Sequence, residues 1–222
     1  MSRTLFGFYE LDASPQRGLP GELATRLGAA TETPGFIDGA VFVRSDNFGV
    51  AIQARFDGDG EDGAWQKTGG IALLLQAADW RSRASDLATY RLARHVDGDT
   101  DTVRDSTFFI VQRFDVPEGR QDEFVDTICA YTEEYAQPIP GFLGGDAYAS
   151  LDRKHVVFVM PWAHEAALNT LENRAGSLDA MQRHLALSER HSFASYQRVS
   201  FLRGTVGADA REPATASRRG AA

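Results

Sequence analysis

Apolar residues in the second half of the chain change from a strand-like spacing to a helix-like spacing. Residues 107–116 are rich in β-branched and aromatic side chains, which is typical of a strand. Further on, apolar side chains recur at intervals of four, three and four residues, at Phe124, Ile128, Tyr131 and Tyr135. This spacing places them on one face of an amphipathic helix, so the pattern predicts a strand followed by a helix.

The rest of this half predicts a hairpin, a broken helix and a closing strand. Two short strands are expected over 144–151 and 155–162, on either side of a polar turn. Residues 163–187 have a helical pattern, with a break at Gly176 and Ser177 as the N-cap of the second part. A last strand is expected over 195–202. The order β-α-β-β-α-β is that of a ferredoxin-like unit.

Short motifs recur along the chain in the same order and indicate an internal duplication. Pro34-Gly35-Phe36 recurs as Pro140-Gly141-Phe142, at an offset of 140 − 34 = 106. Ala88-Thr89-Tyr90 recurs at the same offset as Ala194-Ser195-Tyr196, and Phe56 then corresponds to Trp162. In the first strand, residues 4–6 align with 107–109 at an offset of 103.

The first half therefore predicts another copy of the same unit. Its strands are expected over 4–12, 40–44, 50–56 and 87–96, and its helices over 21–30 and 64–82. We expect a first unit at residues 1–97, a polar linker at 98–105, a second unit at 106–204 and a disordered tail at 205–222. The predicted fold class is α+β, with two tandem ferredoxin-like units whose antiparallel sheets pack as an intrachain dimeric α+β barrel.

Composition and charge argue against several classes of partner. The chain has 222 residues, a net charge of −8 and two lysines, Lys67 and Lys154. Nucleic acids and anionic membranes are therefore poor candidate partners. The single cysteine, Cys129, excludes an intramolecular disulfide and a thiolate metal cluster. No apolar stretch approaches the length of a membrane span or a secretory signal, so we expect a cytoplasmic protein.

The segment from Phe108 to Leu202 resembles the antibiotic biosynthesis monooxygenase family, within the dimeric α+β barrel superfamily. The resemblance rests on the first strand running into Pro117-Glu118-Gly119-Arg120, on Phe124, on Pro140-Gly141-Phe142 and on Trp162 at a strand end. It implies a small oxygenase without flavin, haem or metal. The implied reaction uses O₂ to oxidise an electron-rich phenol, such as an anthrone-like polyketide ring, to a quinone. The implied partners are a small aromatic substrate and O₂.

The resemblance also implies which residues form the site. Trp162 stands at the position of a pocket tryptophan in the family, and Phe158 replaces an Asn that family members often place four residues earlier. Because Phe56 replaces the tryptophan in the first unit, we expect that unit to be degenerate as a site.

Four residues are candidates for catalysis: Trp162, Arg198, Tyr196 and His164. Trp162 offers an indole N–H from an apolar body. Tyr196 and Arg198 are two apart on a predicted strand, so they share a face and could bind a phenolate or carboxylate. His164 follows Trp162 and could accept a proton near neutral pH.

Six further residues are candidates for substrate binding: Asn169, Asn173, Tyr131, Tyr135, Phe158 and His184. Asn169 and Asn173 share a helix face at a spacing of four residues. Tyr131 and Tyr135 lie in the apolar stripe of the first helix of this unit, and their hydroxyls could reach a pocket rim. His184 lies at the edge of a helical stripe, where it could be a buried base.

Three other interpretations stay open. A related polyketide cyclase could use the same fold. A haem protein is the cofactor-dependent alternative, with His184 as the nearest candidate ligand. A non-catalytic ligand-binding protein is the third, and a homodimer is possible in each case. No phosphate-binding loop and no metal-ligand motif is present in the sequence, so no metal is expected.

Overall fold

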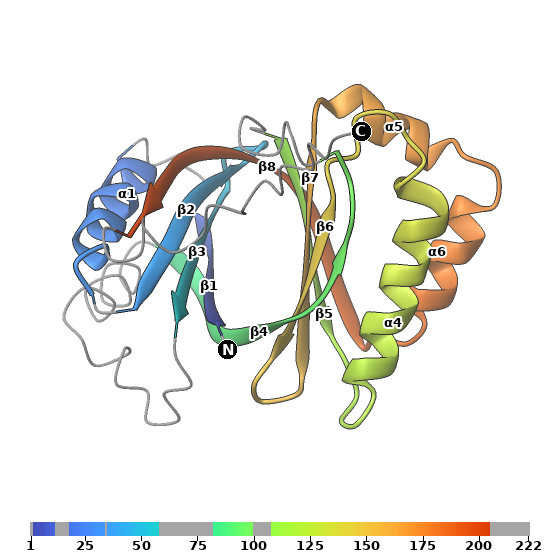
Figure 1. Ribbon diagram of the computed structural model, residues 1–222, viewed down its shortest axis with the longest axis horizontal. Coiled ribbons are helices and arrows are strands. Elements are labelled where there is room, and N and C mark those ends of the chain that lie inside the picture. The colour runs from blue at the N-terminus through green and yellow to red at the C-terminus, as the bar shows by residue number, and fades with distance from the viewer. Residues whose placement is uncertain (1, 12–17, 34, 58–81, 100–107, 205–222) are drawn as a thin grey trace, which may run out of the picture.

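Eight antiparallel strands close into a barrel in the order β1-β3-β2-β8-β5-β7-β6-β4 (Figure 1). The computed structural model describes residues 2–11, 18–33, 35–57, 82–99 and 108–204. The strands are β1 (Ser2–Leu11), β2 (Phe36–Arg44), β3 (Gly49–Asp57), β4 (Ser82–Val96), β5 (Phe108–Asp115), β6 (Gly145–Ser150), β7 (His155–Trp162) and β8 (Arg190–Arg203). The predicted α+β fold class, a closed barrel made by one chain, is confirmed.

The same strand order occurs in both halves of the barrel. The first half runs β4-β1-β3-β2 and the second runs β8-β5-β7-β6. The halves join at two seams, where β2 pairs with β8 and β6 pairs with β4. Because closure pairs every strand on both sides, no strand of the barrel is left as an open edge.

The two longest strands, β4 and β8, each take part in both halves. Tyr90 on β4 lies opposite Thr4 of β1 and opposite Ser150 of β6. In the same way, Tyr196 on β8 lies between β5 and β2, opposite Phe109 and Arg44. Both tyrosines are buried inside the barrel, and each ends one of the repeated tripeptides found in the sequence. The repeated motif therefore lies where each long strand passes from one half to the other.

Strand pairing corrects the alignment predicted for the first strands of the two halves. Phe56 lies opposite Arg3, and Trp162 lies opposite Phe108. Arg3 thus corresponds to Phe108, an offset of 108 − 3 = 105 and not the predicted 103. A slip of two residues leaves every side chain on the same face of a strand, so the apolar pattern alone cannot detect it.

Helices cover the outside of the barrel in both halves (Figure 1). They are α1 (Leu19–Ala30) on the first half, and α4 (Gln121–Tyr131), the π-helical turn η2 (Thr132–Ala136), α5 (Glu165–Glu172) and α6 (Ser177–Leu185) on the second. The predicted break at Gly176 is present, and this residue has a left-handed φ of 79°. Ser177 is not the N-cap: Gly176 occupies that position, and Ser177 begins α6.

Some predicted segments lie outside the described residues. These are the linker, apart from residues 98 and 99, the tail, and the helix expected over 64–82, apart from Ser82, which begins β4. The division into domains stays a prediction. The closing strand β8 begins at Arg190, five residues earlier than predicted. No helix in the described part of the chain is long and apolar enough to cross a membrane.

The sheet is buried on both faces in the second half, which explains the unbroken apolar sequence of β7. Phe158, Met160 and Trp162 face the helices and join one core cluster. Val157 and Val159 face the barrel interior and join another, with Tyr196. A strand buried on both faces needs apolar side chains in both directions. The second half therefore offers two separate environments, one under the helices and one inside the barrel.

Candidate functional site

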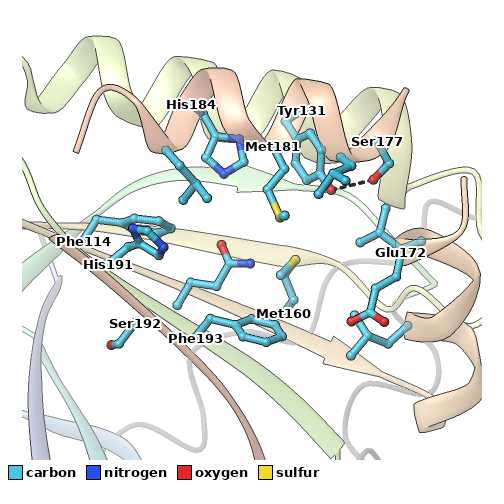
Figure 2. A pocket seen from close by; sticks show the side chains of 15 residues that line it. Phe114, Tyr131, Met160, Glu172, Ser177, Met181, His184, His191, Ser192 and Phe193 are labelled. Atoms are coloured by element: carbon cyan, nitrogen blue, oxygen red, sulfur yellow. Dashed lines mark hydrogen bonds between the residues drawn. The ribbon is translucent and has the colours of Figure 1, made fainter. Parts of the chain in front are cut away.

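A cavity of about 350 Å³ lies between the sheet and the helices of the second half (Figure 2). Its walls come from β5, β7 and β8 on one side and from α4, α5 and α6 on the other. The lining residues are Gln112, Phe114, Tyr131, Met160, Leu168, Leu171, Glu172, Ser177, Leu178, Met181, His184, Leu185, His191, Ser192 and Phe193. A cavity of this size, with an apolar lining and a few polar groups, is typical of a small-molecule site.

The sheet side of the cavity follows from the alternation of side chains along the strands. Gln112 and Phe114 are two apart on β5 and point to the same side. Directly opposite them on β8 lie Phe193 and His191, respectively. Phe193 is 55% exposed, so this wall reaches from the buried sheet to the surface of the molecule.

The corresponding wall in the first half is filled by a side chain. By the corrected register, Gly7 corresponds to Gln112, and Tyr9 to Phe114. A Cβ at Gly7 would lie 2.8 Å from the Tyr9 hydroxyl, so the tyrosine occupies the space next to the glycine. The Tyr9 side chain therefore leaves no room at position 7 for a polar side chain like that of Gln112.

His184 on α6 is the most unusual group in the cavity wall. Its side chain is 1% exposed, and neither ring nitrogen makes a well-directed hydrogen bond within the described residues. Its ring lies 4.9 Å from the ring of Tyr131 and 6.3 Å from that of Phe114. Burial lowers the pKa of His184 to about 4, the charge of His191 acts in the same direction, and the Ala180 carbonyl opposes them. The imidazole is therefore neutral at physiological pH.

A hydroxyl pair joins two of the helices that cover the cavity. Tyr131 on α4 and Ser177 on α6 share a hydrogen bond of 2.9 Å. Burial raises the pKa of Tyr131, and the charge of Glu172 contributes in the same direction. Tyr131 therefore keeps its proton and can act as a hydrogen-bond donor at the cavity wall.

Within the described part of the chain, Glu172 is the one carboxylate that lines the cavity, and no Lys or Arg lines it. It is the last residue of α5 and is exposed. Figure 2 shows its side chain extending from α5 among the residues that line the cavity. Burial is the main cause of the raised pKa of Tyr131, and the charge of Glu172 adds a smaller effect in the same direction.

Of the ten predicted site residues, Tyr131 and His184 line the cavity. Trp162 and Phe158 face the same side of the sheet but are fully buried in the core, and neither belongs to the lining. The Trp162 ring packs edge-to-face against Phe142, with the centroids 5.2 Å apart. Both positions therefore hold core side chains beside the cavity.

Tyr196 and Arg198 share a face, as predicted, but that face points into the barrel. Tyr196 is buried in the interior cluster, and Arg198 lies over the ring of Phe109, 5.2 Å from its centroid. The sheet itself separates them from the cavity. The structure thus divides the predicted constellation between two sides of one sheet.

The other predicted residues lie on the outside of the helices. His164 is exposed and caps α5, with its Nδ1 accepting a hydrogen bond of 3.2 Å from the Ala167 amide. Asn169 and Asn173 are exposed, and the Asn173 amide donates to the Asn169 carbonyl at 2.7 Å. Tyr135 stacks on Tyr131 with centroids 5.3 Å apart but does not line the cavity.

The sequence interpretation missed several lining residues, among them Gln112, Met160, Glu172 and Phe193. Gln112 had a detectable signal, because it is a polar residue on the helix-facing side of β5, whose adjacent residues on that side, Ile110 and Phe114, are apolar. Glu172 and Phe193 carried none, since a polar residue at a helix end and an aromatic residue before a predicted strand are both common.

The described lining residues do not suit a haem. Haem carries two propionates, which arginine or lysine would pair with, and the described residues of the lining include neither. His184 is the one buried candidate ligand in the lining, and the carboxylate of Glu172 would oppose the propionates. Within the described residues, no group of three or more His, Cys, Asp and Glu side chains could hold a metal ion.

Comparisons with known proteins agree with this architecture. An anthrone oxidase-like protein shares 17% identity with a TM-score of 0.77, over 95% of this chain and 97% of that one. A protein from Fusobacterium nucleatum, provisionally named a monooxygenase, shares 10% identity with a TM-score of 0.67, over 91% and 94% of the two chains. One from Lactobacillus acidophilus, named in the same way, shares 7% identity with a TM-score of 0.61, over 92% and 97%.

These likenesses establish a shared fold. No curated protein matches the chain. Residues 107–183, which contribute most of the cavity, match the family model described as antibiotic biosynthesis monooxygenase. The chain therefore carries, in the second half of a closed α+β barrel, a domain of the antibiotic biosynthesis monooxygenase family.

Proposed function

We propose that the protein is a cofactor-independent monooxygenase that oxidises an electron-rich, polyketide-like aromatic ring with O₂ in this cavity. The observation that carries the proposal is His184, a neutral imidazole without a well-directed hydrogen bond in the wall of a largely apolar cavity. A buried polar group normally has a partner, and a phenol or enol hydroxyl of the substrate would supply one.

The first step removes a proton from the substrate. A neutral imidazole offers one acceptor nitrogen and one N–H donor. In the cavity, His184 accepts the phenolic or enolic proton, and the resulting imidazolium is attracted to the oxyanion that it creates. This attraction offsets the low intrinsic basicity that burial causes, because charges interact strongly where water is excluded.

The second step passes electrons from the substrate anion to O₂. The anion forms a carbon–oxygen bond with O₂, and the peroxide loses water to leave a quinone. For an anthrone, one O₂ is consumed, one oxygen atom enters the ring carbonyl and the other leaves as water. The Tyr131 hydroxyl and the Gln112 amide are donors in the lining that can hold the oxyanion. The apolar walls keep water from the reactive carbon.

The two halves have unequal roles in this proposal. We infer that they are tandem copies of one unit, with the first at residues 1–97 and the second at 106–204. The common strand order and the tyrosines at both crossings support this inference. The second unit carries the site.

A binding protein without catalysis is the second candidate. It is favoured by the placement of Trp162, Tyr196, Arg198 and His164 outside the cavity. This leaves His184 and His191 as the histidines of the lining. The two functions make opposite predictions for a His184 variant, since binding alone needs no proton acceptor.

Oxygen uptake with an anthrone tests the proposed function. The neighbour called anthrone oxidase-like makes this compound class the first to try. We expect uptake by the wild type and a 10²–10⁴-fold lower kcat/KM in His184→Asn, roughly the contribution of a general base. The control is His95→Asn, because His95 lies on the first half and pairs with Asp146 outside the cavity. Equal uptake by His184→Asn and wild type would exclude the assigned base, and substrate binding without any uptake would favour the binding protein.

A further inference from the structure

The charge of the cavity lining is negative. Among the described residues that line it, Glu172 is the single carboxylate, and no lysine or arginine balances it. The neighbouring Arg174 donates to the Tyr135 carbonyl at 2.9 Å and lies over the Tyr135 ring. A bound molecule therefore meets a negative charge that no cation among these described lining residues neutralises.

The position of Glu172 is unfavourable for the stability of its own helix. It is the last residue of α5, where the backbone carbonyls already carry partial negative charge. Glu165, in the first turn of the same helix, has the favourable position for an acid. A carboxylate that opposes the helix dipole and lines a cavity is better explained by what it does to a ligand than by folding.

We propose that Glu172 is a specificity-determining residue that excludes aromatic substrates carrying a carboxylate and favours neutral ones with free hydroxyl groups. The inference rests on the proposed function and names the substrate class more narrowly. A phenolic hydroxyl can donate to the Glu172 carboxylate, whereas a substrate carboxylate is repelled by it. Figure 2 shows Glu172 and His184 on different helices and at separate places along the cavity, so the acid acts on a part of the substrate away from the proton acceptor.

The reaction that supplies such a substrate follows from this preference. The excluded group is a carboxyl group on the aromatic ring. A site that excludes this group must act after a decarboxylation, or on a ring that never carried the acid. The class of reaction placed before this protein is therefore one that delivers an uncharged phenol.

Binding of two non-reactive quinones tests the proposal without depending on turnover. The probes are a dihydroxyanthraquinone and its carboxylated analogue, with affinity measured by quenching of protein fluorescence. We expect wild type to bind the neutral quinone roughly tenfold more tightly, with a ratio that shrinks as salt is added. The ratio should approach one in Glu172→Gln, and Glu172→Lys should prefer the carboxylated compound.

Glu165→Gln is the matched control, because it removes the same charge from the same helix outside the cavity. It should keep the wild-type ratio and lower the midpoint of thermal unfolding, whereas Glu172→Gln should raise that midpoint. Equal binding of both quinones by the wild type, or an unchanged ratio in Glu172→Gln, would overturn this inference and leave the proposed function intact. Failure of both quinones to bind would overturn both.

Discussion

Burial fixes the protonation state of single residues in this cavity. His184 is held neutral because its ring packs among aromatic side chains, and Tyr131 is held protonated for the same reason. The site thus offers a proton acceptor and a proton donor on neighbouring helices. Such a pair is suited to a neutral phenol, which gives up one proton and needs one hydrogen bond to the oxygen left behind.

The lowered pKa of His184 predicts how stability depends on pH. The unfolded chain binds a proton at this residue below about pH 6.5, and the folded protein does so only below about 4. Stability is therefore full above pH 6.5 and is lost as the pH falls from 6.5 to 4, by about 3 kcal/mol from this group. Urea unfolding of wild type and His184→Gln across this range measures it. An equally steep pH dependence in the variant would show that other groups are responsible.

At the scale of elements, the apolar pattern predicted the strands and helices that are held by packing. The stripe through Phe124 and Ile128 is buried, as a helix with that spacing should be. The start of β8 was missed because Arg190, His191 and Ser192 are exposed. Their strand conformation comes from backbone pairing with β5, which leaves no mark on the local sequence.

The same limit applies to the candidate site. A period of two shows that Tyr196 and Arg198 share a face, but it does not show which face turns toward the helices. That choice depends on how the sheet closes, which is a property of distant strands. His184 and Tyr131 could be predicted because they lie on helices, whose apolar stripe must face the sheet.

The connection between α5 and α6 contains a glycine, Gly176, whose replacement should destabilise the protein, and a glycine in α1 serves as the control. Gly176 has a φ of 79°, and a Cβ there would lie 3.3 Å from the Tyr135 hydroxyl. Gly176→Ala should therefore destabilise the protein by about 1–2 kcal/mol. Gly28 lies within α1 with open space around it, so Gly28→Ala should stabilise by roughly 0.5–1 kcal/mol. Denaturant unfolding of both variants distinguishes the two effects, and a loss of stability in each would contradict this account.

For the whole molecule, closure of the barrel depends on two seams between the halves. In the second half taken alone, β6 and β8 would lose the partners that β4 and β2 provide. Unpaired edges of this kind bind other strands. The fold therefore predicts that neither half is stable as a separate monomer, because two of its strands would have an unpaired edge.

Expression of residues 106–204 alone tests this dependence. The fragment should form a homodimer, because its β8 can take the place of β4 beside the β6 of a second copy. Light scattering after size-exclusion chromatography gives the mass directly. The full chain in the same buffer is the control, and a folded monomeric fragment would be incompatible with the role given to the seams.

Joining both halves in one polypeptide has a consequence for how the protein can evolve. In a symmetric homodimer every substitution appears twice, so a change that opens a cavity weakens both subunits at once. In a single chain, a substitution changes only one half of the barrel. Here Tyr9 fills the space beside the sheet in the first half, whereas Gln112 and Phe114 line a cavity at the corresponding place in the second half. One half is free to accumulate the substitutions that a new ligand requires, and the other is free to be selected for rigidity alone.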